Sequence, residues 1–372
     1  MRIMFVAGGT GGHINPAVAV AKEIKRLNPT AEILFVGTEG RMETQIVPKA
    51  NFNIKTVEMN GFSRNLSLKG IVENIKTVTL TLKASSKAKE IIKEFNPDVV
   101  VGFGGYVTGP VLRTAAKMGI KTAIHEQNAF PGVANKALAK LVDKVMLTSA
   151  AAEKYMNCKN PPVVTGLPVR REIVKTDRDF ARATLGLRDN DMLVLSMGGS
   201  LGADAINNAV VQMLERLKDE KNICFLHATG KYGAWVGDKL TEKGVSFGKG
   251  TNIEIREYID NMDICLPACD LVISRAGASS ISEIQALAKP SILIPSPNVA
   301  ENHQFHNAMT LAENDGAILI EEKNLNSEIL ANKVLELKNN PAKLHEISLN
   351  ASRNARLNAL SEICNIITDL AK

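Results

Sequence analysis

The chain alternates short apolar runs with longer stretches in which apolar residues recur at helical spacing. Runs typical of buried strands occur at 2–6, 32–37, 98–103, 122–126 and 144–148, and helical patterns at 16–27, 42–49, 110–118 and 134–142 separate them. The same alternation restarts at 192–196 and continues through the apolar runs at 224–228, 253–257, 270–275 and 291–295. This pattern predicts an α/β protein built of βαβ units, with parallel sheets covered by helices on both faces.

Each half of the pattern opens with a strand, a glycine-rich turn and a helix. The first opening is MRIMFVAGGTGGHINP at 1–16, and the second is MLVLSMGGSLGADAIN at 192–207. The repeat predicts two Rossmann-like domains, which we expect at 1–165 and 166–372, with a linker within 165–175. We expect the last helix to pack back on the first domain. Because open α/β sheets bind ligands beyond the carboxyl ends of their strands, we expect the active site in a central cleft that the two domains face.

The composition is that of a soluble globular protein, with 45% hydrophobic and 23% charged residues among 372. Five cysteines without a CxxC pair predict reduced thiols in a cytoplasmic protein, rather than a disulfide framework or a zinc site. No apolar run approaches the roughly 18 residues of a membrane span. The first strand begins directly after Met1 and leaves no room for a signal peptide, so we expect no export.

The net charge of +6 is unevenly distributed. Residues 1–165 contain 22 Lys and Arg against 12 Asp and Glu, and the remainder contains 23 against 27. A positive surface on the first domain would suit a polyphosphate or an anionic membrane. Aromatic residues make up only 4% of the chain, and no basic motif carries stacking rings, so we do not expect nucleic acid as a partner.

The two glycine turns are candidate anion sites. A glycine turn that leads into a helix brings backbone N–H groups and the helix dipole close to an anion, because no side chain blocks the approach. Either turn taken alone is also compatible with a tight turn that binds nothing, but two such turns facing one cleft favour anion sites. Neither turn matches the P-loop pattern or a clean GxGxxG, and Glu39 is a poor candidate for a ribose ligand. An NAD-dependent dehydrogenase therefore remains only an alternative.

Polar residues follow the first turn and a later strand of the first half. His13 stands directly after the first turn, where it can act as general base for a hydroxyl nucleophile or simply orient the loop. The run AIHEQN ends in His125, Glu126, Gln127 and Asn128, and we expect these four residues at the ligand edge of the sheet. Glu126 can serve there as a base or as a buried hydrogen-bonding scaffold.

The second half contains a corresponding stretch at 275–290, which predicts a strand end, a small-residue turn and a helix start. We expect Glu283 in the first turn of that helix, where a carboxylate accepts hydrogen bonds from ribose hydroxyls or complements the helix dipole. His303, Gln304 and Asn307 in ENHQFHNA suit sugar hydroxyls. We expect no metal, because no DxD motif stands among the candidate ligand loops to hold a metal and pyrophosphate, and His303 and His306 are not the i, i+4 pair of a helical metal site.

Seven motifs, in order along the chain, together resemble the MurG-type glycosyltransferases of peptidoglycan synthesis. They are GGTGGH at 8–13, GGYVTGP at 104–110, HEQN at 125–128, TGLPVR at 165–170, GGSLGA at 198–203, the stretch 275–283, and HQ at 303–304. The resemblance implies the GT-B fold. It also implies an inverting enzyme that moves GlcNAc from UDP-GlcNAc to the muramyl 4-hydroxyl of lipid I, which is undecaprenyl-pyrophosphoryl-MurNAc-pentapeptide. The products would be lipid II and UDP.

The resemblance further implies individual roles, with no cofactor. The residues implied for UDP-GlcNAc are Thr10, Gly11, Gly12, Asn128, Arg170, Ser200, Tyr258, Ile259, Ala278, Ser279, Ser280, Ile281, Ser282, Glu283 and Gln304. Those implied for the acceptor are Gly9, Tyr106 and His125, with the acceptor pyrophosphate against the first glycine turn. His13 is the expected base, and Glu126 or a water molecule is the alternative.

The lipid tail of such an acceptor implies a peripheral protein on the cytoplasmic face of the cell membrane, where anionic lipids attract Lys and Arg. The segment 68–95 suits either membrane contact or packing on the sheet. Its apolar residues Ile71, Ile75, Val78 and Leu82 lie at helical spacing beside Lys83, Lys87, Lys89 and Lys93. Other cell-wall synthesis proteins are further expected partners. Another UDP-sugar:lipid glycosyltransferase and a UDP-GlcNAc epimerase remain alternatives.

Overall fold

The structure is a computed structural model that describes residues 1–59 and 68–372, and within helix α3 it leaves out the side chains of 68–76 and 78. The predicted apolar positions Ile71, Ile75 and Val78 therefore lie outside the described side chains. The chain forms two compact units, one of residues 1–168 together with 356–372, and one of residues 169–355. Residues 171–175, within the expected linker, form the short helix α6 (Arg171–Lys175).

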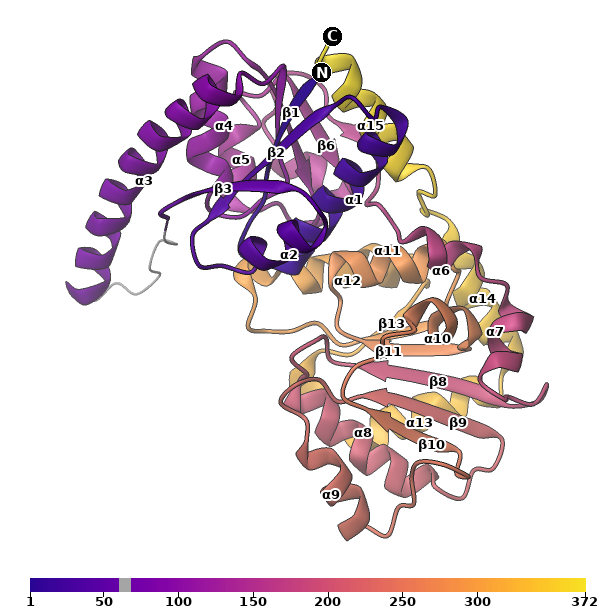
Figure 1. Ribbon diagram of the computed structural model, residues 1–372. Coiled ribbons are helices and arrows are strands. Elements are labelled where there is room, and N and C mark those ends of the chain that lie inside the picture. The colour runs from indigo at the N-terminus through magenta and orange to yellow at the C-terminus, as the bar shows by residue number, and fades with distance from the viewer. Residues whose placement is uncertain (60–67) are drawn as a thin grey trace. The chain divides into compact units, whose positions relative to one another are not determined.

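In the described residues, the first unit contains a seven-stranded parallel sheet in the order β3-β2-β1-β4-β5-β6-β7 (Figure 1). Its strands are β1 (Arg2–Val6), β2 (Glu32–Thr38), β3 (Asn53–Val57), β4 (Val99–Gly102), β5 (Lys121–Glu126), β6 (Lys144–Leu147) and β7 (Val163–Val164). Ile3 of β1 pairs with Ile33 on one side and Val99 on the other. The order reverses direction between β1 and β4, which makes this the switch point where ligands of such sheets bind.

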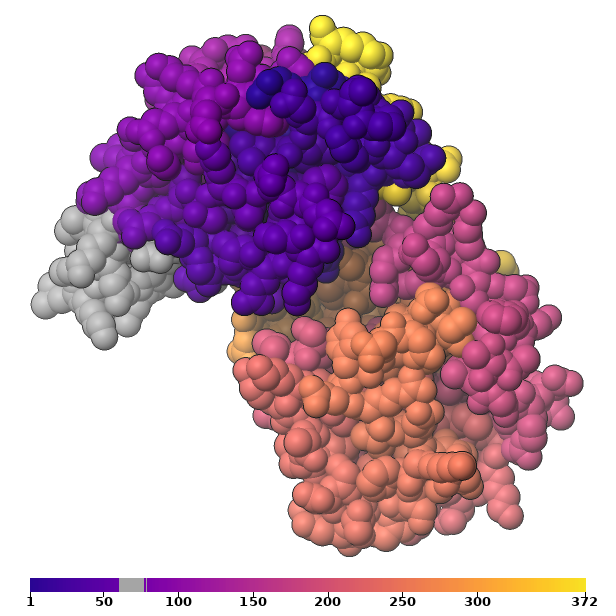
Figure 2. Space-filling model, viewed as in Figure 1, coloured from indigo at the N-terminus to yellow at the C-terminus, as the bar shows by residue number. Residues whose placement is uncertain are grey.

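Helices cover both faces of this sheet. They are α1 (Gly11–Leu27), α2 (Glu43–Lys49), α3 (Leu68–Phe95), α4 (Thr108–Lys117), α5 (Val133–Leu138), the 3-10 helix η1 (Ala150–Tyr155) and α15 (Ala359–Leu370). Because successive strand residues point to opposite faces, Met4 packs in the core under α3 and α4, while Phe5 packs in the core under α1. Helix α15 joins the second of these cores through Ile363 and Ile367 and lies against α1 (Figures 1 and 2).

In the second unit, the described strands form a six-stranded parallel sheet in the order β10-β9-β8-β11-β12-β13. They are β8 (Met192–Met197), β9 (Ile223–Ala228), β10 (Ile253–Arg256), β11 (Leu271–Ser274), β12 (Ser291–Leu293) and β13 (Ile318–Leu319). The helices besides α6 are α7 (Arg178–Thr184), α8 (Asp204–Leu217), α9 (Trp235–Glu242), α10 (Met262–Ala268), α11 (Ala278–Ala286), α12 (His303–Ala312), α13 (Ser327–Lys338) and α14 (Pro341–Ser352), with 3-10 helices η2 (Ala300–Asn302) and η3 (Glu322–Asn324). The switch point lies between β8 and β11.

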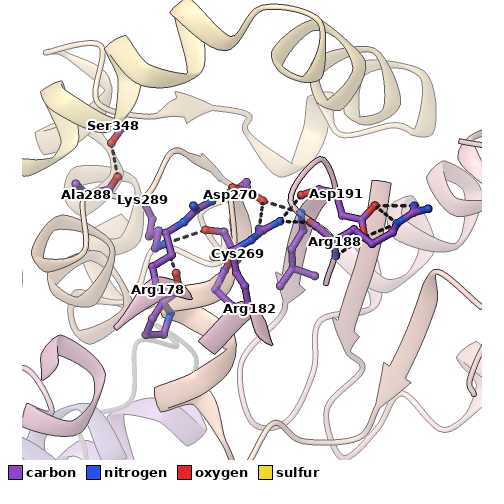
Figure 3. Close-up of polar contacts among 12 residues, drawn as sticks. Arg178, Arg182, Arg188, Asp191, Cys269, Asp270, Ala288, Lys289 and Ser348 are labelled. Carbon is purple, nitrogen blue, oxygen red and sulfur yellow. Dashed lines mark hydrogen bonds and ion pairs between the residues drawn. The ribbon is translucent and has the colours of Figure 1, made fainter. Parts of the chain in front are cut away.

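A network of charged side chains supports the second sheet at the amino ends of its strands (Figure 3). Asp270, which precedes β11, forms ion pairs with Arg178 and Arg182 and accepts a hydrogen bond of 2.8 Å from the N–H of Leu193. Lys289 is 6% exposed, and its ammonium donates to the carbonyl oxygens of Pro267 and Cys269, while burial lowers its pKa. The network provides hydrogen-bond partners for buried polar groups at the amino ends of the strands. It therefore lies at the opposite end of the sheet from the loops that follow the carboxyl ends.

The two sheets confirm the predicted α/β class of two Rossmann-like folds, because each contains the strand order 3-2-1-4-5-6 when its own strands are counted in sequence, and the first adds β7 as a seventh strand after the sixth. None of the helices in the described part of the chain has the length and apolar character that crossing a bilayer requires.

Candidate functional site

The loop after β1 presents backbone N–H groups at the switch point of the first sheet. Helix α1 begins at Gly11, with Thr10 as an extended N-cap residue, and Gly9 has a φ of 87°, which favours glycine. The N–H groups of Thr10, Gly11 and Gly12 have no acceptor among the residues that the structure describes. Together with the dipole of α1, these three N–H groups can bind an anion.

A chain of hydrogen bonds connects His13, at the start of α1, to side chains beneath it. Nδ1 of His13 lies 2.9 Å from Oε1 of Gln127, and Nε2 of Gln127 lies 3.1 Å from Nδ1 of His125. Nε2 of His125 lies 2.9 Å from the carbonyl oxygen of Gly166. Since a carbonyl oxygen only accepts, His125 donates through Nε2, and its Nδ1 accepts from Gln127. Oε1 of Gln127 then accepts from Nδ1 of His13, which leaves the lone pair of neutral His13 on Nε2.

His125 lies deeper than the sequence predicted. Its side chain is 0% exposed and stacks on Phe103, and burial lowers its pKa to about 4. Both ring nitrogens are engaged within the protein. The prediction that His125 borders the acceptor is therefore corrected: a fully buried ring has no atom to offer a ligand, and it acts by holding Gln127.

Glu126 organises the loop that follows β5. Its side chain is 1% exposed. Oε1 accepts from the N–H of Asn128 at 2.9 Å, and Oε2 accepts from the N–H of Gly132 at 3.1 Å and from Nδ2 of Asn135 at 2.8 Å. These bonds hold Asn128 half-buried at the carboxyl end of the sheet. Of the two roles that the sequence left open, this geometry favours the buried scaffold.

The loop after β4 packs directly against the loop after β1. The N–H of Gly8 donates to the carbonyl oxygen of Gly104 at 3.2 Å. A Cβ on Gly104 would lie 2.7 Å from Nδ1 of His13, and one on Gly105 would clash with the carbonyl oxygen of Gly8. The two glycines therefore allow the loops to approach closely. Tyr106, which follows them, is 58% exposed and available to a ligand.

The second unit repeats this arrangement at the end of β8. Gly199 and Gly202 have φ values of 95° and 87°, and Ser200 between them is exposed. A Cβ on Gly202 would clash with the carbonyl oxygen of Thr229, so the loop lies tightly on the loop after β9. The tight packing leaves Ser200 facing solvent at the carboxyl end of the sheet.

A cavity of about 380 Å³ lies next to this loop. Its lining residues are Gly198, Gly202, Ala203, Asp204, Ala205, Arg275, Ser296, Asn298, Gln304 and Glu322. Arg275 forms an ion pair with Glu322 and donates to the carbonyl oxygens of Ile294 and Pro295 at 3.1 and 3.2 Å. Gln304 is fixed in the wall because its Oε1 accepts from the N–H of Ser296 at 2.9 Å.

Helix α11 begins beside the same edge, directly after β11. It starts at Ala278, and its first turn contains no acidic residue, so Glu283 lies in the second turn. The prediction that Glu283 stands in the first turn was wrong, because the helix starts at the small residues rather than after them. Glu283 pairs with Arg170 through both oxygens. Ile281 and Ser282 are buried, so their side chains face the core.

The predicted uracil residues follow β10. Tyr258 is 57% exposed, while the side chain of Ile259 is buried in the core under α10 and α11. Only the backbone of Ile259 is therefore available to a ligand, together with the exposed ring of Tyr258. Among the described residues, no group of three His, Cys, Asp or Glu side chains is arranged to hold a metal ion.

Within each unit the predicted residues gather at one edge. In the first unit, the loops after the neighbouring strands β1, β4 and β5 carry them. In the second unit, the loops after β8, β10 and β11 and the start of α12 carry them. Sequence reasoning placed Gln127 at the ligand edge without a role of its own, and assigned no role to Arg275, Glu322 or the buried Glu43. Arg275 was detectable as a charge directly after an apolar run, but the other three depend on contacts between distant segments.

Comparison with known proteins gives two family matches. Residues 3–147 match the model of the glycosyltransferase family 28 N-terminal domain, and residues 193–363 match that of the glycosyltransferase family 28 C-terminal domain. A relative from Acetivibrio thermocellus is 43% identical over 372 residues, which is 100% of this chain and 99% of the relative. It is named UDP-N-acetylglucosamine–N-acetylmuramyl-(pentapeptide) pyrophosphoryl-undecaprenol N-acetylglucosamine transferase.

Two solved structures have a fold similar to that of this chain over nearly its full length. The crystal structure of Acinetobacter baumannii MurG is 28% identical with a TM-score of 0.80, and the match covers 99% of each chain. The UDP-GlcNAc 2-epimerase of Neisseria meningitidis bound to UDP-GlcNAc is 16% identical with a TM-score of 0.64, covering 99% of this chain and 100% of the epimerase. At that identity the epimerase shares the fold alone.

Proposed function

The chain belongs to glycosyltransferase family 28, and we propose that it transfers N-acetylglucosamine from UDP-GlcNAc to the muramyl 4-hydroxyl of lipid I, yielding lipid II and UDP. The observation that carries this proposal is the 43% identity, over the full chain, to a transferase with that substrate name. The loops at the carboxyl edges of both sheets support it, because each offers donors for an anionic group and both substrates carry a pyrophosphate.

The donor binds to the second unit. Its diphosphate lies against Ser200 and the first N–H groups of α11, where the helix dipole favours negative charge. Glu283, held by Arg170, accepts hydrogen bonds from the ribose hydroxyls. Tyr258 covers the uracil, and Gln304, in the wall of the cavity, contacts the GlcNAc.

The acceptor binds to the first unit. We assign the N–H groups of Thr10, Gly11 and Gly12 mainly to its pyrophosphate, because they have no acceptor within the described part of the protein. The resemblance also implies these three residues for UDP-GlcNAc, and that second role stays a prediction. Tyr106 is exposed beside this loop and contacts the muramyl group. These N–H groups and one exposed ring can hold the acceptor without a charged side chain at the reacting hydroxyl.

His13 is the general base of a single displacement. Because Nδ1 of His13 donates to Gln127, its Nε2 carries the lone pair that takes the proton of the 4-hydroxyl. The hydroxyl oxygen forms a bond to the anomeric carbon from the face opposite UDP as the bond to the phosphate oxygen breaks. The electron pair of that bond leaves with UDP, whose charge the donors of the second unit stabilise. An α-linked donor thus gives a β-linked product, and no covalent enzyme intermediate forms.

The protein acts as a peripheral protein on the cytoplasmic face of the membrane that contains the lipid acceptor. The positive charge of residues 1–165 supports this location, as do the exposed side chains of Lys83, Lys87, Lys89 and Lys93 along α3. Each cation near an anionic leaflet contributes about 1 kcal/mol of attraction.

One assay tests the proposal. Purified protein is incubated with labelled UDP-GlcNAc, with and without a short-chain lipid I analogue, and the products are separated. We expect a labelled disaccharide-lipid only when the analogue is present, with the β configuration by NMR of the anomeric proton. Turnover without the analogue would instead indicate an epimerase, and absence of turnover with it would overturn the proposal.

A further inference from the structure

The side chain of Glu43 is fully buried behind the glycine loop of the first unit. It lies at the start of α2, and its exposed fraction is 0%. Oε2 accepts from the N–H of Gly9 at 3.1 Å, and Oε1 accepts from the N–H of Thr38 at 2.8 Å. Gly9 follows β1 and Thr38 ends β2, so one carboxylate bridges the carboxyl ends of two neighbouring strands.

Two glycines provide the space for this carboxylate. A Cβ on Gly8 would lie 2.5 Å from Oε1 of Glu43, and a Cβ on Gly37 would lie 2.5 Å from its Cγ. Both distances are too short for non-bonded atoms, so any larger residue at either position would displace Glu43. Gly8 and Gly37 are therefore glycines because of the Glu43 side chain, and not because a ligand approaches them.

The bridge determines which N–H groups of the loop remain for an anion. Glu43 engages the N–H of Gly9, and the carbonyl oxygen of Gly104 engages that of Gly8. On the other side, the carbonyl oxygen of Thr10 accepts from the N–H of His13. The N–H groups left over in this stretch are those of residues 10–12, which all stand at the start of α1.

We propose that Glu43 is a positioning residue for the acceptor: it holds Gly9 inward so that the N–H groups of Thr10, Gly11 and Gly12 face the acceptor pyrophosphate and His13 faces the hydroxyl. This inference rests on the proposed function, because it assigns the pyrophosphate to that loop. Glu43 itself touches neither substrate, since no part of its side chain reaches the surface.

The chemistry of the bridge requires a carboxylate. Two opposed backbone donors need two acceptor oxygens, and a carboxylate supplies both. The isosteric glutamine has one oxygen, so its NH₂ group would meet either the N–H of Gly9 or that of Thr38 and leave it buried without a partner. Aspartate keeps both oxygens but is one methylene shorter, so it can maintain only one of the two bonds at these distances.

The test compares Glu43→Gln and the milder Glu43→Asp with a matched control, Asp143→Asn. Asp143 also accepts from a backbone N–H, that of Thr122 at 2.9 Å, but at the amino ends of β5 and β6. Steady-state kinetics with a lipid I analogue and UDP-GlcNAc give kcat and both KM values, and thermal unfolding is followed in parallel.

We expect kcat/KM for the acceptor to fall about 10- to 100-fold in Glu43→Gln, and less in Glu43→Asp, because one buried N–H loses its acceptor. The KM for UDP-GlcNAc should stay within twofold. Asp143→Asn should lower the unfolding temperature yet leave acceptor kinetics unchanged. An inactive wild-type protein would refute the proposed function instead. Unchanged acceptor kinetics in both Glu43 variants would overturn the inference, as would an equal loss for donor and acceptor.

Discussion

Arg170 and Glu283 form a two-point ion pair, in which Nε lies 2.7 Å from Oε1 and one terminal nitrogen lies 3.0 Å from Oε2. The Glu283 side chain is 13% exposed and the Arg170 side chain 54%. A planar guanidinium that engages both oxygens fixes the plane of the carboxylate. Each carboxylate oxygen can accept a second bond, so the pair can hold Glu283 ready for two ribose hydroxyls without first breaking apart.

Replacing Glu283 should weaken donor binding more than turnover. Glu283→Gln loses the charge that orients Arg170 and one of the two acceptor oxygens. We expect the KM for UDP-GlcNAc to rise about tenfold, with kcat changed less than threefold, because the ribose is remote from the reacting carbon. Glu254→Gln, which breaks the exposed pair with Arg256 on β10, is the control and should leave both constants unchanged.

His13→Ala should lower kcat about 100-fold or more, because the displacement loses its general base. UDP-GlcNAc binding, measured by calorimetry, should change little. His345→Ala, at an exposed position on α14, is the matched control. If kcat of His13→Ala equals that of the wild-type protein, His13 is not the base.

Gln127→Met should lower kcat while leaving the KM values nearly unchanged. The methionine fills a similar volume but neither accepts from Nδ1 of His13 nor donates to His125. Neutral His13 is then free to place its proton on either nitrogen, and only one form has the lone pair on Nε2. We expect a loss of about tenfold, smaller than that of His13→Ala, and the combined variant should be no worse than His13→Ala alone. Additive losses would show that Gln127 acts separately from His13.

The succession of strands and helices along the chain and the position of the glycine loops were predictable, because they follow from local patterns: apolar runs, helical spacing and turn residues. The stretch GTEGRMET shows where such patterns stop being informative. It contains two glutamates four residues apart, and the sequence drew attention to Glu39, which is exposed in the structure. Glu43 is the one that reaches Gly9, because α2 packs its first turn behind the loop of a strand 34 residues earlier.

The hydrogen-bond chain of the first unit could not be predicted from local sequence patterns either, because it also joins residues that are distant in the sequence. The sequence placed Gln127 at the ligand edge together with its neighbours, but its partner His13 lies 114 residues away in the sequence. The burial of His125 likewise depends on Phe103, in the loop after another strand. Residue type and neighbourhood identified the edge of the sheet, and only packing across strands distinguished the exposed groups from the supporting ones.

The stability of the second unit should fall as the pH drops below neutral, because of His227. Its ring is 0% exposed, and burial lowers its pKa from 6.5 to about 4, while Ser196 offers one hydrogen bond at 2.8 Å. The unfolded chain binds a proton on this residue below about pH 6.5, and the folded chain does not until about pH 4. Within that window, His227 should therefore cost about 1.4 kcal/mol of stability for each unit of falling pH.

The check is urea unfolding between pH 4.5 and 7, followed by the fluorescence of Trp235. Trp235 is the single tryptophan of the sequence and lies in α9, so it reports on the second unit. His227→Asn should reduce the slope of stability against pH by about one proton. An unchanged slope would mean that other groups carry the pH dependence.

Asp270→Asn should destabilise the second unit without altering its donor site. The substitution removes the carboxylate that pairs with Arg182, whose side chain is only 9% exposed (Figure 3). Arg182 keeps its bonds to the carbonyl oxygens of Arg188 and Asp191, so its charge stays buried without an anionic partner. We expect a loss of about 2 to 4 kcal/mol in the Trp235-detected unfolding transition. The exposed Asp219→Asn should change the free energy of that transition by less than about 0.5 kcal/mol.

The donor site should be unaffected by either substitution. Because Asp270 precedes β11 and the candidate donor residues follow the carboxyl ends of the strands, the KM for UDP-GlcNAc at 25 °C should be unchanged in both variants. An increased KM in Asp270→Asn alone would show that the network at the amino ends also sets the geometry of the loops at the other edge of the sheet.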